Sequence, residues 1–360
     1  MTFDPPENVG GIEGRSKAYA AELTRRGHAV HLLVFSPVRS PPPAEPFDYA
    51  STRFNSSVFR LPRAMVATLE VLRKGSFQSL LLISGSLTFF GLCLLISCRA
   101  LRIHSIAFFY GRDILSARKH LAKSFLLNCA ISLADKVAVN SNFTRSLLPG
   151  GVSKSVLIQP SVHQGMVNEV NVSTNTSRTN RILFVGRLVW RKGADVLLNA
   201  FAELTILCPD SVLDVVGDGP EMPALRNLAH RLGVGGKVVF HGSLVGPELY
   251  ARFSESDVVA MPSKGTSNDV EGFGTVFIEA GIFGKPVVGT WTGGIPEAVL
   301  DGKTGLLVPD GDTHALAEAL HRILSDQGLR VRLGTEGRKR ALSEFTLTKV
   351  VDKIEQAIRA

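Results

Sequence analysis

Two glutamates, Glu271 and Glu279, lie eight residues apart in the stretch from Asp257 to Asp310. A carboxylate can accept two hydrogen bonds from a vicinal diol, so this pair suits a polyhydroxylated ligand. The glycines of Gly272-Phe273-Gly274 would let the backbone approach that ligand closely, and the helix expected from Thr275 to Phe283 would present unpaired N–H groups to an anion. In a plainer interpretation, which the spacing leaves open, Glu279 lies on a helix surface and Glu271 only complements the helix dipole.

Two cations, Arg187 and Lys192, follow another short apolar run, Ile182 to Val185. Arg can hold a diphosphate through a bidentate fork, and Lys can hold it as a point charge. Basic loops are common, so this pattern alone indicates an anion site only weakly.

The elements that must position these residues are short apolar runs that alternate with helical patterns, which predicts an α/β fold with parallel sheets covered on both faces. Open sheets of this kind bind ligands at the carboxyl ends of their strands, where both loops would lie. Strands are expected at residues 29–35, 80–83, 103–109, 136–139, 156–158, 182–185, 213–216, 238–240, 257–261 and 286–288.

Residues 75–98 contain no charged side chain, and a run of this length could span a bilayer. Several Ser and Gly residues between positions 84 and 91 interrupt the run. We therefore expect a buried strand, a glycine turn and a buried helix ending near Leu101, since this arrangement continues the alternation on either side. A spanning or re-entrant segment is the alternative.

The chain has 360 residues, 45% hydrophobic and 20% charged, and is long enough for two globular domains. Its four scattered cysteines have no metal-ligand spacing and fit a reducing compartment. The chain does not open with a cationic segment followed by an apolar core, so we expect a cytoplasmic protein rather than a secreted one.

Charge is divided unevenly along the chain: residues 1–160 carry a net charge of +10, and residues 161–360 carry −2. The basic half favours an anionic partner such as a membrane surface or a phosphorylated acceptor. A helix expected at residues 58–74, with four cations on its polar face, is a candidate for peripheral membrane contact. No recognition motif indicates nucleic acid.

Six motifs, in order, resemble the retaining group-1 glycosyltransferases of family four. The motifs are Gly10-Gly11, Tyr110-Gly111-Arg112-Asp113, Gly186-Arg187-Leu188 with Lys192-Gly193, Val216 to Pro220, the Glu271 and Glu279 pair, and Gly305 to Pro309. The resemblance implies a GT-B fold, in which two Rossmann-like doubly wound domains face each other across a cleft. It divides the chain into an acceptor-side domain (1–165), a linker (166–180), a nucleotide-sugar domain (181–342) and a helix crossing back to the first domain (343–360).

The resemblance also implies roles for individual residues. Arg187 and Lys192 would hold the donor diphosphate, and Glu279 would bind the nucleotide ribose. Glu271, with the backbone of Phe273, Gly274 and Thr275, would hold the transferred sugar. From the first domain, Gly11 would face the diphosphate, and Gly10 and Tyr110 would also contact the donor.

No cofactor and no metal are expected. Although Asp310-Gly311-Asp312 spells the Asp-x-Asp of metal-dependent transferases, we interpret it as a turn in which Asp312 caps the next helix. The resemblance implies a reaction with retention, by front-face attack of the acceptor. Residues 269–274 with Gly293 to Val299 most resemble mannosyltransferases acting on lipids, which favours GDP-mannose over a UDP-sugar and a lipid or glycan acceptor.

The sequence departs from this family at two points. An apolar strand normally precedes the glycine loop, whereas Met1 to Asp4 precede it here, so we expect the first sheet to lack a central strand. Tyr110 also stands where the family usually has His. These departures favour a second hypothesis, a non-catalytic nucleotide-sugar-binding or membrane-associated protein with the same fold.

Overall fold

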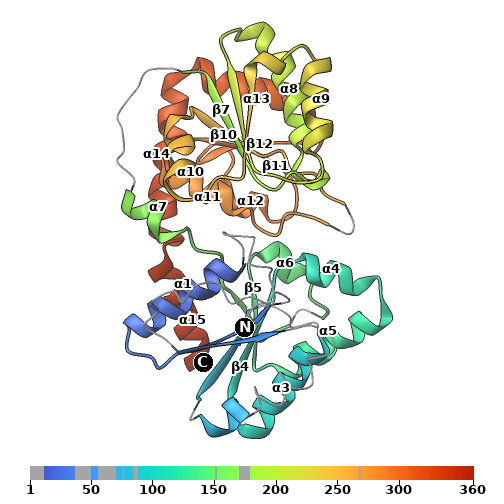
Figure 1. Ribbon diagram of the computed structural model, residues 1–360, viewed down its shortest axis with the longest axis vertical. Helices are drawn as coiled ribbons and strands as arrows, with labels where there is room; N and C mark the ends of the chain where they lie inside the picture. The colour runs from blue at the N-terminus through green and yellow to red at the C-terminus, as the bar shows by residue number, and fades with distance from the viewer. Residues whose placement is uncertain are drawn as a thin grey trace. The chain divides into compact units, whose positions relative to one another are not determined.

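The computed structural model describes residues 12–36, 50–55, 70–75, 77–83, 88–150, 152–169, 179–266 and 269–360. The chain forms two compact units (Figure 1). The N-terminal unit comprises residues 1–161 and 347–360, and the C-terminal unit comprises residues 162–346. Each unit has a parallel sheet packed against helices, so the expected α/β class is confirmed.

The C-terminal unit contains a six-stranded parallel sheet with the order β12-β11-β10-β7-β8-β9. From β7 the chain continues outward through β8 and β9, and from β10 it continues in the other direction, so the order reverses between β7 and β10. Such a reversal is the point where open α/β sheets bind ligands. The strands are β7 (Arg181–Val185), β8 (Val212–Val216), β9 (Val238–Gly242), β10 (Val258–Ala260), β11 (Val287–Thr290) and β12 (Gly305–Val308).

Helices cover this sheet on both faces, and β10 is buried along its whole length. The glycines of α11 and α14 allow these two helices to lie very close, since a Cβ on Gly281 would be 2.9 Å from the Gly337 carbonyl oxygen. The helices are α7 (Gln164–Glu169), α8 (Ala194–Leu207), α9 (Met222–Arg231), α10 (Gly246–Glu255), α11 (Thr275–Ile282), α12 (Ile295–Ala298), α13 (Thr313–Ser325) and α14 (Gln327–Glu344), with 3₁₀ turns η2 (Trp190–Lys192) and η3 (Gly235–Lys237).

The N-terminal unit contains a four-stranded parallel sheet, β3-β4-β5-β6, and a separate parallel pair, β1-β2. Among the described residues, no strand joins β1 to β3. In the doubly wound order the first strand separates these two groups; residues 1–11, which precede α1, lie outside the described residues. The strands are β1 (His31–Ser36), β2 (Ala50–Asn55), β3 (Ser79–Leu82), β4 (His104–Phe109), β5 (Lys136–Val139) and β6 (Ser155–Leu157).

Successive side chains of β4 point to opposite faces of the sheet and pack into two separate apolar cores. Ala107 and Phe109 pack with α3 and α5, whereas Ile106 and Phe108 pack with α1 and α15 on the other face. The helices are α1 (Ile12–Arg25), α3 (Phe89–Leu101), α4 (Arg112–Arg118), α5 (Leu121–Leu133), α6 (Asn142–Ser146) and α15 (Leu347–Arg359).

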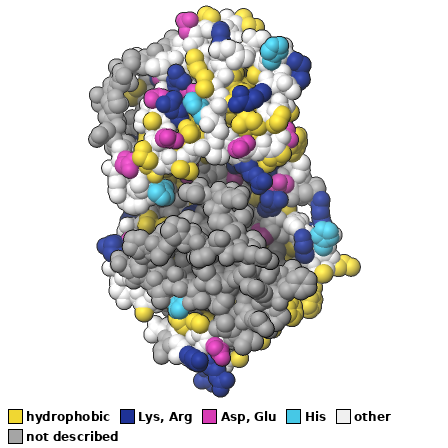
Figure 2. Space-filling model, viewed as in Figure 1, with side chains coloured by type: hydrophobic (Ala, Val, Ile, Leu, Met, Phe, Trp, Pro, Cys, Tyr) yellow, Lys and Arg dark blue, Asp and Glu magenta, His cyan; other side chains and the backbone are white. Residues whose placement is uncertain are grey.

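The buried strand and helix expected within residues 80–101 are confirmed as β3 and α3. In the described part of the chain, no helix combines the length and apolarity needed to cross a membrane. Residues 58–69 of the candidate interfacial helix lie outside that part. On the face shown in Figure 2, basic, acidic and apolar side chains are interspersed over the C-terminal unit.

His28, three residues before β1, has an acidic partner that is distant in sequence: its Nε2 lies 2.8 Å from the Glu355 carboxylate of α15. Arg26 forms an ion pair with the same carboxylate at 3.2 Å. The partner is distant in sequence, and only the packing of α15 on α1 brings it to the histidine.

Candidate functional site

The loops that follow β7 and β10 meet where the strand order reverses. Lys192, at the end of η2, places its Nζ 2.5 Å from Oε2 of Glu271 and 3.5 Å from the sulfur of Met261, the residue that follows β10. Arg191 donates to the same Glu271 oxygen at 2.6 Å. Two cations from one loop are therefore gathered around one carboxylate from the other.

Electrostatics keep Glu271 ionised in this cluster. Burial by itself raises the pKa of the Glu271 carboxyl, but the charges of Lys192 and Arg191 outweigh it and lower the pKa to about 2. Glu271 and Asp269, which lies 3.3 Å from the Arg191 Nε, together balance the charges of Lys192 and Arg191.

The N-terminus of α11 lies beside this cluster. Gly274, the N-cap residue, adopts φ +89°, and a Cβ there would be 2.7 Å from the Phe277 ring and 3.7 Å from the Glu271 Cγ. Within the described chain, no side chain caps this helix; the Phe277 amide donates to the Gly274 carbonyl at 3.1 Å, which leaves the amides of Thr275 and Val276 for a ligand. A glycine is required both by the left-handed backbone and by the space.

A second glycine pair supports the Glu271 loop from behind. The Gly294 amide donates to the Glu271 carbonyl oxygen at 2.9 Å. A Cβ on Gly294 would lie 2.0 Å from the Gly272 oxygen, and one on Gly293 would lie 2.3 Å from the Glu271 oxygen. The loop before α12 thus fixes the backbone on which Glu271 is carried.

Arg191 is the site residue that sequence reasoning missed. Its Nε lies 3.3 Å from Asp269, and its carbonyl accepts from the Lys264 amide at 2.7 Å, so it contacts the loop before Glu271 at two points. The neighbouring Lys192 was the available signal, but the sequence does not show which cation of a basic loop turns inward.

Arg187 takes a different position from the one expected of a partner to Lys192. It follows β7, but its side chain is exposed and contacts no partner among the described residues. Within the described part of the chain it is an unpaired cation at the carboxyl end of the inner strand β7. The structure therefore brings Lys192 and Glu271 together and leaves Arg187 outside their ion-pair cluster.

The other expected residues of this unit lie along α11. Phe273 is buried against Phe345, with ring centroids 5.5 Å apart, so only its backbone is available to a ligand. Thr275 opens the helix and is partly exposed. Glu279 lies one turn further along, and its charge contributes to the raised pKa of Tyr250, although burial is the main cause.

Tyr110 belongs to the N-terminal unit, at the end of β4. Its amide donates to both oxygens of Asp113, at 3.1 and 3.2 Å. Burial raises the pKa of the Asp113 carboxyl to about 6, although hydrogen bonds from the backbone amides oppose that rise. Gly10 and Gly11 lie outside the described residues.

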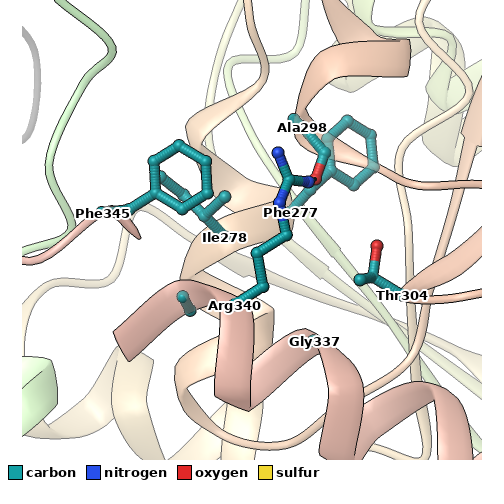
Figure 3. A pocket seen from close by; sticks show the side chains of 8 residues that line it. Phe277, Ile278, Ala298, Thr304, Gly337, Arg340 and Phe345 are labelled. Atoms are coloured by element: carbon teal, nitrogen blue, oxygen red, sulfur yellow. Dashed lines mark hydrogen bonds between the residues drawn. The ribbon is translucent and has the colours of Figure 1, made fainter. Parts of the chain in front are cut away.

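Two further features lie apart from the cluster. The small pocket in Figure 3 lies between α11, α12 and α14, where Arg340 donates to the carbonyls of Glu297 and Ala298 and stacks over Phe345 at 5.1 Å. Its Arg340 contacts hold helices together. Asp312 accepts from the Ala315 amide at 2.9 Å, which confirms its role as the N-cap of α13.

Comparison with known proteins identifies the family. Residues 168–340 match the family model of group 1 glycosyl transferases, and residues 9–162 match that of Glycosyltransferase Family 4. A GDP-mannose-dependent alpha-(1-6)-phosphatidylinositol monomannoside mannosyltransferase of Mycolicibacterium smegmatis is 30% identical over 96% of this chain and 94% of its own. A D-inositol 3-phosphate glycosyltransferase of Corynebacterium jeikeium is 42% identical, over 44% of this chain and 38% of its own.

Solved structures show the same fold at low sequence identity. Anabaena Alr3699/HepE, in complex with UDP and glucose, superposes with a TM-score of 0.76 at 19% identity, over 99% of this chain and 98% of its own. Sucrose-phosphate synthase of Thermosynechococcus elongatus superposes with a TM-score of 0.72 at 22% identity, over 97% and 93%. With the two family models and the full-length relative, these likenesses show that the chain belongs to the group-1, family-4 glycosyltransferases and has the GT-B fold.

Proposed function

We propose that this glycosyltransferase moves a hexose, with retention of configuration, from a nucleotide-diphosphate sugar to a lipid or glycan acceptor. The observation that carries the proposal is the cluster of Lys192, Arg191 and Glu271 beside the uncapped N-terminus of α11. Cations, free amides and one carboxylate at the switch point of a parallel sheet suit a diphosphate joined to a sugar.

In this proposal the roles follow the family pattern. Lys192 has three N–H donors and can bind a phosphate oxygen while it keeps its bond to Glu271. Arg187, exposed and unpaired within the described chain, is free to close on the same diphosphate. Glu271 and the backbone from Phe273 to Thr275 would bind the sugar, and Glu279 would bind the ribose.

The transfer breaks the bond between the anomeric carbon and the diphosphate oxygen. A bond from an acceptor oxygen forms on the same face of the sugar, and the acceptor proton goes to the departing diphosphate. Negative charge develops on the leaving group, so fixed cations and helix amides aimed at it stabilise the transition state. We propose that the reaction needs neither a metal ion nor a cofactor.

The donor is proposed to be GDP-mannose, with a UDP-sugar as the second choice. The full-length relative named above is a GDP-mannose-dependent mannosyltransferase, which supports mannose, and the phosphatidylinositol monomannoside in its name supports a lipid acceptor. A lipid acceptor would bring the enzyme to a membrane surface, where the basic excess of residues 1–160 would favour anionic lipid.

The proposal is tested first by thermal stabilisation with a panel of GDP-, UDP- and ADP-sugars. Transfer assays then combine the best donor with phosphatidylinositol, its monomannoside or simple glycans as acceptors. We expect the largest stabilisation with GDP-mannose and an α-linked product by NMR, with transfer persisting in chelator. A β-linked product would contradict retention. Donor binding with no transfer to any acceptor would favour the non-catalytic hypothesis.

A further inference from the structure

Helices α3 and α5 of the N-terminal unit are apolar on both sides. Their inner residues, including Leu94 and Ile131, pack onto the sheet. Their outer sides carry large apolar residues among polar ones, with Phe89 72%, Ile96 50%, Leu121 94% and Phe125 66% exposed. A helix that covers one face of a sheet normally presents polar residues outward.

On each helix these exposed apolar side chains lie on one side rather than being scattered around it. Leu121 and Phe125 are four residues apart on α5, and Phe89 and Ile96 are seven apart on α3, so each pair shares one side of its helix. The two helices pack against each other. We call these four residues the α3–α5 apolar face.

Positive charge accompanies the α3–α5 apolar face. Asp113 is the only carboxylate between Glu70 and Asp135 in the sequence, and backbone amides occupy its oxygens. The exposed cations of α3, of α5 and of their flanking turns are Arg99, Arg102, Lys119 and Lys123. Figure 2 shows apolar, basic and histidine side chains together at the right edge of this unit, where α4 and α5 lie in Figure 1.

Lys123 donates to the Ser116 hydroxyl at 3.1 Å, and the nearby Arg118, at the end of α4, donates to the Leu147 carbonyl at 2.7 Å, so both partners are neutral. In the described part of this surface no ion pair joins the four cations to a carboxylate, although Asp135 follows α5. An anionic partner would therefore gain from their charge.

We propose that the α3–α5 apolar face docks on an anionic lipid bilayer. Its Phe, Leu and Ile side chains would enter the boundary between headgroups and acyl chains, while Lys119, Lys123 and Arg102 would contact lipid phosphates. A second copy of this chain fits the same face less well, because a symmetric contact would bring its cations together. The inference extends the proposed function, since a lipid acceptor lies in a bilayer, but it can be tested without any transfer.

The test is co-sedimentation of the full chain with vesicles of phosphatidylcholine alone or mixed with phosphatidylglycerol. Two double variants probe the face: Leu121→Ser with Phe125→Ser, and Lys119→Gln with Lys123→Gln. The matched control is Ile206→Ser with Leu207→Ser, two residues of α8 that are 81% and 61% exposed on the other unit. All these side chains are largely exposed, so the fold should persist, and melting curves verify it.

We expect binding to the anionic vesicles only, weakened by salt because surface charges are screened. Each cation near such a surface contributes about fivefold in affinity, so both face variants should bind at least tenfold more weakly and the control should bind normally. Absent binding, equal binding to neutral vesicles, or full binding by the face variants would overturn the inference. A dimer that the Leu121 and Phe125 changes dissociate would also overturn it. Stabilisation by donor sugars, measured on the same samples, reports separately on the proposed function.

Discussion

The Lys192 Nζ lies 2.5 Å from the Glu271 Oε2, although the two residues are 79 positions apart in the chain. This ion pair ties the loop after β7 to the loop after β10 at the point where the strand order reverses. The ammonium is therefore held in place before any donor arrives, and preorganised charge of this kind contributes most to stabilising a departing anion.

Replacing Lys192 or Glu279 with Ala should each weaken donor binding about 10- to 150-fold, because each change removes a charged hydrogen bond worth roughly 1.5–3 kcal/mol. Calorimetric titration with the donor selected by the panel measures the loss. Lys303→Ala and Glu318→Ala, which alter exposed charges elsewhere on the same unit, are the matched controls. Unchanged donor affinity in either test variant would reject its assigned role.

Substitutions of Arg187 and Arg191 should differ in their effects on donor affinity and on the free energy of unfolding. Arg187→Ala should lower donor affinity yet change the free energy of unfolding by less than about 0.5 kcal/mol, because the side chain is exposed. Arg191→Ala should cost about 1.5–3 kcal/mol of stability, since it removes the hydrogen bond to Glu271 and the contact with Asp269. Urea denaturation of both variants provides the comparison, and equal losses would contradict it.

Gly294→Ala should displace the loop that carries Glu271. The new Cβ would lie 2.0 Å from the Gly272 carbonyl oxygen, so backbone must move, at a cost of about 1–3 kcal/mol. Donor affinity should fall with stability, because the shift reaches Glu271 and Gly274. Gly236→Ala, where a Cβ meets nothing within 4 Å, is the control. Full donor affinity in Gly294→Ala would mean that this backbone contact does not position the site.

Local pattern was sufficient to predict the strands and helix around the site. The apolar runs at 257–261 and 286–288 correspond to β10 and β11, and the helix expected at 275–283 is α11 within one residue. Two strands were missed. β2 (Ala50–Asn55) lacks an apolar run, whereas β12 (Gly305–Val308) is an apolar run as long as β11 that was interpreted only as part of a motif, and it pairs in parallel with β11.

Side-chain pairing could not be predicted in the same way. Arg187 and Arg191 are equally basic in the sequence, and only the path of η2 directs Arg191 toward Glu271 while Arg187 stays exposed. Which arginine turns inward depends on the backbone at Gly193. Its φ is +69°, and a Cβ there would be 1.9 Å from the Pro262 oxygen, so only a glycine allows this turn. Contacts of this kind belong to the tertiary fold.

The last prediction concerns Asp113, whose partly buried carboxyl accepts from the amides of Tyr110 and Ile114. Burial raises its pKa from about 3.8 to about 6, so the folded chain holds the proton more tightly than the unfolded chain does. This contribution to stability is complete below about pH 4 and is lost as the pH rises through 6, by up to about 3 kcal/mol.

Asp113→Asn keeps an acceptor oxygen but cannot ionise. Its stability relative to the unchanged protein should therefore rise between pH 4 and pH 7 in urea denaturation, with Asp210→Asn, an exposed carboxylate, as the control. A difference that stays constant over this range would show that the fold does not favour the protonated form of Asp113.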